Sequence, residues 1–574
     1  MRLLDWIVLI FSLVVIVGYG LHKSRGKQTI RDYLLAGKSM PWWAMGLSIM
    51  ATQASAITFI GTTGQAYVDG MRFVQFYFGL PLAMVILSAT VVPFFHRAGV
   101  VTAYEFLEQR FDAKTRVAAS VVFLIQRGLG VGLALYAPAV VMSVILGWSE
   151  RATVLIMAGI VLAYAVPGGV KAVTWTDVQQ MMLIFLGVFA AFLTAVYLMP
   201  AHVSLGDALY LAGVSGKLNA VDLSFDLKNR YNLWSGLIGG MFLALSYFGC
   251  DQSQVQRYLT GKSIAHSRIS LLFNGFVKVP LQFFILLTGA MVFSFFLFEK
   301  PPMLFNRVEA AKIERTTAVE PKAEYQAAIQ KYDQAYAQRR QVIEQMIETR
   351  HNPPAGAVAI NPAALTAANR AVNDARREGI DALEKASPGT AYDDTNYIFL
   401  TFVTRYFPVG LVGLVIAAIF AAAMSTISAE LNALASTTVM DIYRRFINRE
   451  AEDRHYVFAA KTATVCWGIY AGVFAFFGGR LGSLIEAVNM VGSLFYGSLL
   501  GVFVLAFGFP RATGTGTFIG LIAGEIAVLL TSRLTDISYL WFNVVGCVVV
   551  VIIGSIASEF VGTRNKLATH GGRV

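Results

Sequence analysis

Residues 48–58 read Ser-Ile-Met-Ala-Thr-Gln-Ala-Ser-Ala-Ile-Thr, and a second polar run, Gly-Thr-Thr-Gly-Gln, follows at residues 61–65. Both runs lie inside an apolar block that extends from about residue 42 to residue 67. The block is long enough to cross a hydrocarbon core of ~30 Å, yet its small and polar residues suit a lipid-facing helix badly. The stretch therefore predicts a membrane helix that is interrupted near its middle, where freed backbone carbonyls are able to coordinate a cation.

A second interrupted span is predicted five spans further along the chain. The block from about residue 233 to residue 259 contains Gly236, Gly239, Gly240, Ser246, Gly249, Asp251, Gln252, Ser253 and Gln254. Paired interruptions in matching positions of two halves are the sequence pointer to a transporter built from inverted repeats. Close helix packing through small residues is the alternative explanation for the glycines.

The rest of the chain fits a helical membrane bundle. Of its 574 residues, 56% are hydrophobic and 14% are charged, whereas a soluble domain usually carries about 25% charged residues. Apolar blocks recur without the alternation typical of barrel strands. We therefore predict an all-α polytopic membrane protein with about thirteen transmembrane helices. Their approximate limits are 3–21, 42–67, 72–95, 115–146, 150–168, 172–198, 233–259, 268–298, 406–440, 456–477, 483–508, 514–532 and 537–558.

The distribution of Lys and Arg predicts how the chain is oriented. Positive residues gather in the odd-numbered connections and in the last residues of the chain, which places those segments in the cytoplasm. We expect a multi-pass protein of the cell inner (cytoplasmic) membrane, with the N-terminus outside and the C-terminus cytoplasmic. The net charge of +11 then needs no nucleic-acid partner. The stretch from Ile7 to Tyr19 is interpreted as an uncleaved span rather than a signal peptide.

A polar segment interrupts the pattern between about residues 299 and 395. Its apolar residues recur every three, four or seven positions, which predicts a helix with one apolar stripe. These residues are Tyr325, Ile329, Tyr332, Tyr336, Ile343 and Met346. After a break at 351–362, a second helical stretch completes an expected extracytoplasmic helical hairpin, which is either a plain insertion or a surface for partner binding or assembly.

The predicted domain organisation follows from these blocks. It comprises an extra N-terminal span (1–21), core spans one to seven (42–298), the hairpin insertion (299–395), core spans eight to ten (396–510), two additional C-terminal spans (511–558) and a cytoplasmic tail (559–574).

Hydroxyl groups inside the ninth span are candidate cation ligands. Residues 421–430 read Ala-Ala-Ala-Met-Ser-Thr-Ile-Ser-Ala-Glu and carry hydroxyls at Ser425, Thr426 and Ser428. Hard cations prefer oxygen ligands. Hydroxyls of this kind also bond back to their own helix, and that reading stays open.

Ionisable residues inside membrane spans are costly and therefore indicate function. The candidates are Arg127, Asp177, Asp251, Lys278, Glu430, Glu486 and Glu525. For Asp177 and Lys278, which lie nearer the cytoplasmic ends of their spans, a structural ion pair and a transport role are both open. All seven histidines lie in loops, span ends or tails, and no nucleotide-binding motif occurs, so we expect a gradient-driven carrier and not an enzyme or an ATP-driven pump.

Several motifs, in order along the chain, resemble those of the sodium/solute symporter family, which includes sodium–glucose, sodium–proline and sodium–sialic acid cotransporters. The matching stretches are AGKSMPWW (36–43), FIG (59–61), EFLEQRF (105–111), GGVKAVTWTDVQ (168–179), Gln256–Arg257, Lys278, Ser425–Thr426 and MDIY (440–443). The resemblance covers residues from about 30 to 510, apart from the hairpin. It implies a leucine-transporter-like core, a five-plus-five inverted repeat formed by the second to eleventh spans.

The resemblance also implies a site for Na⁺. In the family, carbonyls of the first broken helix and one carbonyl and two hydroxyls of the eighth core helix bind the ion. On this sequence those positions are Ala51, Ala54, Ala422, Ser425 and Thr426. Some members have a second sodium site, for which Asp177, Ser425 and Ser428 are in place. Ala429 replaces a further serine of those members, so the number of sodium ions stays open.

The substrate positions implied by the resemblance depart from the sugar carriers. Ile57, Thr58 and Tyr77 replace the acidic and amide groups of the sugar pattern, and Ala244 replaces an asparagine, so glucose and galactose are not expected. The candidate lining residues are Gln53, Ser55, Thr58, Gln75, Phe76, Tyr77, Arg127, Tyr247 and Lys278. Phe76 and Tyr247 match aromatic gate positions. Arg127 is able to hold a carboxylate by a forked pair, which favours organic acids, acidic sugars or amino acids.

We therefore expect a sodium-coupled symporter that imports a small polar solute by alternating access, with sodium ordering the broken second span against the ninth. Two alternatives stay open. One is a proton-coupled carrier that works through Glu430 or Asp177. The other is a solute sensor on the same fold, although about 16 residues follow the last span and no output domain is expected. The oligomeric state is not determined.

Overall fold

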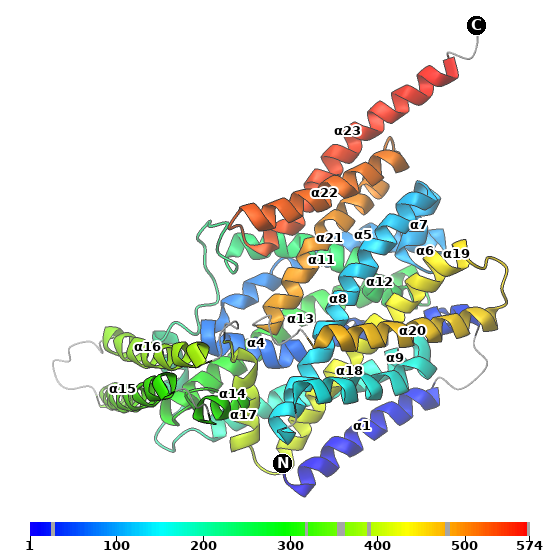
Figure 1. Ribbon diagram of the computed structural model, residues 1–574. Coiled ribbons are helices and arrows are strands. Elements are labelled where there is room, and N and C mark those ends of the chain that lie inside the picture. The colour runs from blue at the N-terminus through cyan, green and yellow to red at the C-terminus, as the bar shows by residue number, and fades with distance from the viewer. Residues whose placement is uncertain are drawn as a thin grey trace.

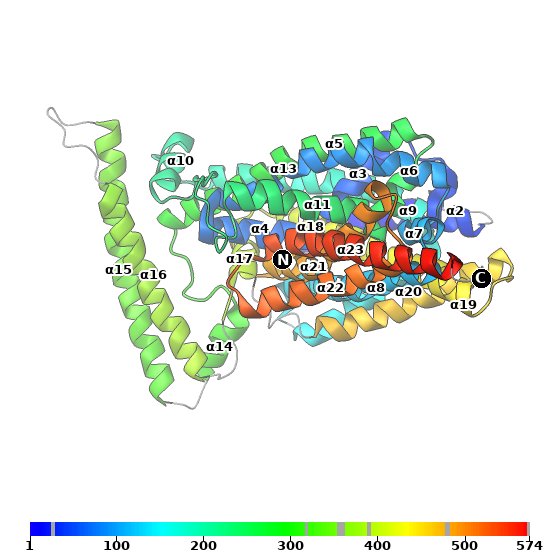
Figure 2. The same cartoon turned by 90° about the horizontal axis from the view of Figure 1, so that it is seen from above.

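The computed structural model describes residues 1–23, 29–147, 149–315, 319–352, 362–386, 392–476 and 483–570. Within these residues the chain is helical apart from turns, short connections and one bridge between Met40 and Gly261. Long helices lie side by side in one bundle. A hairpin of α15 (Val319–His351) and α16 (Pro362–Ala386) lies across one end of this bundle (Figures 1 and 2).

The first half of the bundle corresponds to the first six predicted spans. Its elements are α1 (Leu3–Lys23), α2 (Ile30–Leu35), η1 (Ala36–Lys38), α3 (Trp42–Gln53), α4 (Ala56–Asp69), η2 (Gly70–Tyr77), α5 (Leu80–Ala89), α6 (Val91–Ala98), α7 (Ala103–Arg110), α8 (Ala113–Leu146) and α9 (Glu150–Tyr197). Non-helical backbone at Gly169 (φ 59°, ψ −176°) divides α9 into two helices. A Cβ atom there would lie 2.9 Å from the carbonyl oxygen of Tyr33, so both the positive φ and the close approach require glycine.

The second half contains the remaining spans and the hairpin. Its elements are α10 (Leu205–Val214), η3 (Ser235–Gly239), α11 (Gly240–Gly249), α12 (Gln252–Leu259), α13 (Ile264–Phe298), α14 (Arg307–Arg315), α15, α16, α17 (Thr395–Tyr406), α18 (Leu411–Thr437), η4 (Thr438–Tyr443), α19 (Arg444–Phe446), α20 (Asp453–Ala475), α21 (Leu484–Gly508), α22 (Gly514–Leu534), η6 (Tyr539–Trp541) and α23 (Phe542–His570). The helix α23 continues through most of the segment expected to be a tail.

Ten helices among the described residues are long and apolar enough to cross a membrane, judged by length and composition alone. The other predicted spans coincide with shorter apolar helices, such as α11 and the first part of α9, or with helices joined end to end, such as α4 to α6. The predicted count of thirteen stays a prediction. The prediction also missed α2, α7, α10, α14 and α17, because each is too short or too polar to form an apolar block of spanning length.

Both predicted helix interruptions are confirmed. Between α3 and α4, Ala54 (φ −86°, ψ 67°) and Ser55 (ψ 171°) leave the helical region. Between α11 and α12, Asp251 (φ −81°, ψ 120°) does the same, and its carboxylate accepts a hydrogen bond from the backbone N–H of Ser253. Each interruption exposes helix-terminal donors and acceptors inside the bundle, where a ligand is able to satisfy them.

The hairpin is fastened to the end of α13. Arg339, Tyr336 and Arg340 of α15 donate hydrogen bonds of 3.1, 3.3 and 2.5 Å to the consecutive carbonyls of residues 296–298. These carbonyls belong to the last turn of α13 and lack partners within the helix. Cationic side chains also match the negative end of the helix dipole. The hairpin therefore stabilises the end of a core helix.

Candidate functional site

The break between α3 and α4 faces the hydroxyl groups of α18. The Thr426 hydroxyl donates a hydrogen bond of 3.0 Å to the backbone carbonyl of Thr52, in the last turn of α3 before the break. Ala51, Ala54 and Ala422 are buried beside it. The two segments from which the predicted sodium ligands come are thus in direct contact, although they are 374 residues apart in sequence.

Asp177 of α9 connects three other elements at this level. Its carboxylate accepts hydrogen bonds of 2.5 Å from Ser48 of α3 and 2.5 Å from Ser425 of α18. Arg257 of α12 lies 3.2 Å from the same carboxylate. Asp177 thus has an ion-pair partner, Arg257, and its role in transport stays a prediction.

Ser428 behaves differently from its neighbours on α18. Its hydroxyl donates to the Ser425 carbonyl at 3.1 Å, within the same helix. This is the local bonding that competes with ligand binding for serines in helices. Asp177 and Ser425 are in direct contact, whereas the Ser428 hydroxyl is bonded within its own helix.

Arg127 of α8 is surrounded by acidic and aromatic groups. Its guanidinium donates to Glu430 at 2.7 Å and pairs with Asp251 at the break between α11 and α12. It also donates to the Tyr496 hydroxyl at 2.7 Å and lies 5.3 Å from the ring centroid of Tyr247. One buried cation thus faces two buried carboxylates, and its donors are largely committed to protein groups.

Lys278 of α13 has the opposite environment. It is 0% exposed, and its ammonium has no hydrogen-bond partner among the described residues. The ammonium lies over the ring of Tyr77, with Nζ 5.7 Å from the ring centroid. A buried ammonium without an anion is costly, so an anionic ligand would stabilise Lys278.

The remaining predicted substrate positions, apart from Gln75, differ in accessibility and in the contacts they make. Gln53, Ser55 and Tyr247 are partly accessible at the two helix breaks, and the Thr58 hydroxyl donates to the Gln53 carbonyl at 3.3 Å. The two aromatic gate positions differ: Tyr247 accepts a hydrogen bond of 2.7 Å from Gln254, while Phe76 stacks on Phe73 with a centroid separation of 5.5 Å.

Gln75 is committed to the outer connection rather than to the centre of the bundle. Its amide nitrogen donates to the Tyr231 carbonyl at 2.9 Å, and its amide oxygen accepts from the Asp222 N–H at 2.9 Å. These contacts fasten η2 to the segment that precedes η3.

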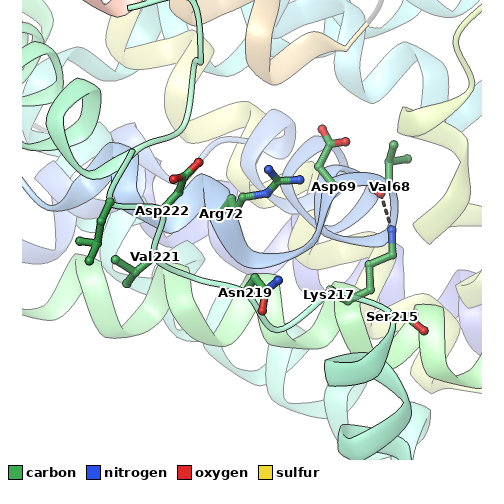
Figure 3. Close-up of a pocket in the computed structure, with 10 residues that line it drawn as sticks. Val68, Asp69, Arg72, Ser215, Lys217, Asn219, Val221 and Asp222 are labelled. Atoms are coloured by element: carbon green, nitrogen blue, oxygen red, sulfur yellow. Dashed lines mark hydrogen bonds between the residues drawn. The ribbon is translucent and has the colours of Figure 1, made fainter. Parts of the chain in front are cut away.

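Two cavities lie at the ends of the bundle. One of about 590 Å³ is lined by Val68, Asp69, Arg72, Ser215, Gly216, Lys217, Asn219, Val221, Asp222 and Leu223 (Figure 3). The other, of about 460 Å³, is lined by Thr29, Ile30, Arg31, Leu34, Gly99, Val101, Glu105, Met440, Arg444 and Asp453. Neither is lined by a predicted substrate residue.

Lys217 shapes the first of these cavities. Figure 3 shows its ammonium pointing to the Val68 carbonyl, to which it donates a hydrogen bond, and it also lies 4.8 Å from the centroid of the Phe293 ring. Burial lowers the pKa of Lys217 to about 8, although Asp69 opposes the shift. Lys217 therefore loses its proton more readily than an exposed lysine does, and Arg72 lines the same cavity.

Direct contacts close the bundle at the end opposite the hairpin. Gln252, just after the second break, accepts from the N–H of Ala103 at 2.9 Å and donates to the carbonyl of Val101 at 3.1 Å. Arg116 donates to Asp441 at 2.7 Å. These contacts join the start of α7 to α12, and the start of α8 to η4, which follows α18.

Near the hairpin, helix contacts close the other end. The Ser483 hydroxyl donates to Gln65 of α4 at 3.2 Å. A Cβ atom on Gly64 would lie 2.1 Å from the Thr395 carbonyl, so α17 packs directly on α4. The predicted central residues therefore lie between these two sets of contacts.

The partners of the predicted residues are what sequence reasoning missed. Arg257, Ser48 and Tyr496 were not singled out as site residues, and Asp251 and Glu430 were not assigned to Arg127. The only sequence signal for these groups is a polar residue inside an apolar block, and it does not identify the partner.

Most of the chain matches the profile of a known protein family. The profile of the sodium:solute symporter family matches residues 33–318 and 379–524. The unmatched residues between these ranges include all of α15 and most of α16. The hairpin is thus largely an addition to the part that the family shares.

Two similar proteins are sodium cotransporters. The sodium/glucose cotransporter of Vibrio parahaemolyticus is 28% identical over 91% of this chain and 83% of its own length. The sodium-coupled monocarboxylate transporter 1 of Xenopus laevis is 26% identical over 90% of this chain and 70% of its own length.

A solved structure shares the fold. It is that of a sodium-coupled sialic acid symporter in a substrate-bound, outward-open state, with a TM-score of 0.74 and 22% identity over 97% of this chain and 98% of that chain. This likeness confirms the predicted all-α, leucine-transporter-like architecture.

Proposed function

The chain belongs to the sodium:solute symporter family, so it is a sodium-coupled membrane transporter and not an enzyme, and we propose that the solute it imports is a small monocarboxylate. The solute enters with sodium by alternating access. Lys278 binds the carboxylate, and the contact between the α3–α4 break and α18 binds the ion.

The observation that carries this proposal is the environment of Lys278. Its ammonium is fully buried and has no partner among the described residues. One unpaired positive charge matches one carboxylate, and a charge-assisted hydrogen bond in a site without water is strong. The monocarboxylate transporters among the relatives support the same solute class.

Arg127 is assigned a positioning role in this proposal. Its pairs with Asp251 and Glu430 connect α8 to the second helix break and to α18. A solute carboxylate placed here would join two carboxylates that already share one guanidinium. Electrostatics therefore favour Lys278 over Arg127 as the group that binds the anion.

The proposed sodium ligands are the carbonyls of Ala51, Ala54 and Ala422 and the hydroxyls of Ser425 and Thr426. The contact from Thr426 to the Thr52 carbonyl supports their proximity. Asp177 positions Ser425 through its hydrogen bond of 2.5 Å. Because Arg257 already neutralises Asp177, the proposal includes one sodium site and gives Asp177 and Ser428 no second ion.

The proposed orientation places the N-terminus and the hairpin outside and the C-terminus in the cytoplasm. In Figure 2, the hairpin lies at one end of the long helices, and α2 and α19 lie at the other. The connections at this second end carry clusters of Lys and Arg, as cytoplasmic loops do.

Uptake by the purified protein in liposomes tests the function. Radiolabelled propionate or lactate should accumulate under an inward sodium gradient and fail to accumulate under a potassium gradient or a pH gradient alone. Accumulation driven by the pH gradient without sodium would favour the proton-coupled carrier. Solute binding without uptake in any gradient would favour the sensor.

Thr426→Ala should raise the sodium concentration for half-maximal uptake about tenfold. The reason is the loss of one hydroxyl ligand, since a hydrogen-bonding group to a charged partner contributes about 1.5–3 kcal/mol. Uptake is measured as a function of sodium at saturating solute. Thr426→Ser keeps the hydroxyl and should stay close to wild type. An unchanged sodium dependence in Thr426→Ala would remove Thr426 from the site.

A further inference from the structure

Three polar side chains form a row along α13. Asn274, Lys278 and Gln282 follow one another at intervals of four residues, so they lie on neighbouring turns of one helix face, about 6 Å apart along the axis. All three are 0% exposed. We call this row the α13 seam. It is unusual, because the rest of the interior face of α13 is mostly apolar or made of small residues.

None of the polar side-chain atoms of the seam has a hydrogen-bond partner among the described residues. They are both amide atoms of Asn274, the ammonium of Lys278 and both amide atoms of Gln282. Most buried polar groups in proteins are hydrogen-bonded, and leaving one unsatisfied is costly. Five such atoms on one helix face indicate a ligand or bound water, rather than chance.

The seam faces the interior of the bundle. Lys278 lies over the Tyr77 ring at the end of η2. A Cβ atom on Gly275 would meet the Met84 side chain of α5 at 2.7 Å, and one on Gly289 would meet the Thr63 carbonyl of α4 at 2.3 Å. The helix therefore packs closely on α4 and α5 on both sides of the seam. Figure 2 shows α13 next to α5 and α3.

The chemistry of the seam is asymmetric. It holds one cation between two neutral amides, and each amide offers both a donor and an acceptor. A hydroxyl group matches an amide in both roles, whereas an alkyl chain leaves the amide unsatisfied. A second carboxylate would have no second cation on the seam.

We propose that the α13 seam selects hydroxylated monocarboxylates, with Lys278 binding the carboxylate and the amides of Asn274 and Gln282 binding hydroxyls on a chain of several carbon atoms. This inference rests on the proposed function and adds a solute preference that the two amides decide. Sites built to hydrogen-bond a solute hydroxyl discriminate strongly against analogues that lack it.

The test compares two six-carbon anions, gluconate and hexanoate, on the full-length protein in detergent with saturating sodium. Ligand binding raises the denaturation midpoint with ligand concentration, which yields a dissociation constant for each anion. The wild type should bind gluconate at least tenfold more tightly than hexanoate. Asn274→Leu and Gln282→Met, which are close in size to the native residues, should each reduce that ratio at least fivefold.

Ser270→Ala is the matched control. Ser270 lies one turn before Asn274 on the same face and is equally buried, but its hydroxyl already donates to the Ser267 carbonyl at 2.8 Å. Its removal should leave the gluconate-to-hexanoate ratio unchanged.

The possible outcomes separate the inference from the proposed function. Hexanoate binding as tightly as gluconate, or a ratio that survives both amide substitutions, would overturn the inference and leave the seam as a site for water only. The monocarboxylate function would still stand in that case. If neither these two anions nor propionate and lactate bind in sodium, the proposed function itself fails.

Discussion

Lys278→Met is expected to reduce sodium-driven uptake of the monocarboxylate at least about 30-fold and, at the same time, to stabilise the solute-free protein. Uptake falls because truncating one partner of a buried charge pair costs about 2–5 kcal/mol. Stability rises because methionine removes an ammonium that is buried without a partner among the described residues. Opposite signs for function and stability are characteristic of a residue kept for its ligand.

Both effects are measurable on the same preparations. Uptake in liposomes gives the loss of transport, and thermal denaturation in detergent without solute gives the change in stability. Lys300→Met is the control, since Lys300 is half exposed and paired with Asp333 at 2.8 Å; it should leave both quantities near wild type. A Lys278→Met variant that transports normally, or that denatures more easily, would show that Lys278 has a structural partner.

Arg127→Met is expected to destabilise the protein by about 3–5 kcal/mol, because it leaves Asp251 and Glu430 buried without their cation. The free energy is measured by titration with sodium dodecyl sulfate in mixed micelles. The triple variant Arg127→Met, Asp251→Asn, Glu430→Gln should recover much of the loss, since replacing all the charges of a buried network is far less costly than breaking it.

An exposed pair provides the control for Arg127. Arg230 pairs with Glu486 at 2.5 Å, but its side chain is 54% exposed, and exposed pairs contribute about 0–1 kcal/mol. Arg230→Met should therefore change the unfolding free energy little. If Arg127→Met kept full stability but lost solute affinity, Arg127 rather than Lys278 would be the group that binds the anion.

In the proposed mechanism, the break between α3 and α4 couples sodium binding to solute binding. Sodium binding at Ala51 and Ala54 would hold this break against Ser425 and Thr426. Gln53 and Ser55 belong to the same break and are candidate solute-lining residues, so ordering it for the ion also orders it for the solute. A ligand shifts a conformational equilibrium only by binding one state better, and the shared break supplies that difference.

The hairpin, which lies largely outside the part that the family shares, contacts the same helix bundle. Its side chains bond to the last carbonyls of α13, the helix that carries the seam. Its own core includes buried Tyr325, Tyr332 and Val372, which explains the apolar stripe seen in the sequence. The stripe therefore reports packing between α15 and α16 and, at Ile343 and Met346, packing against the main core of the bundle.

Much of the fold of this protein could be predicted from the sequence alone. Small and polar residues inside apolar blocks predicted both helix interruptions, because a local run of glycine, serine and threonine is enough to weaken a membrane helix. Apolar block length predicted the all-α membrane bundle, and ordered motifs predicted the family. These are short-range properties, so each could be recognised without knowing which helices are neighbours.

The tertiary structure decided which polar groups have partners. Arg127 is 124 residues from Asp251 and 303 residues from Glu430 in sequence, and only packing brings the three together. The sequence favoured Arg127 as the group that holds a carboxylate and left the role of Lys278 open, yet the fold pairs Arg127 with two carboxylates and leaves Lys278 without a partner among the described residues. Because a buried charge depends on its neighbours in space, the group available for a solute could be assigned only from the structure.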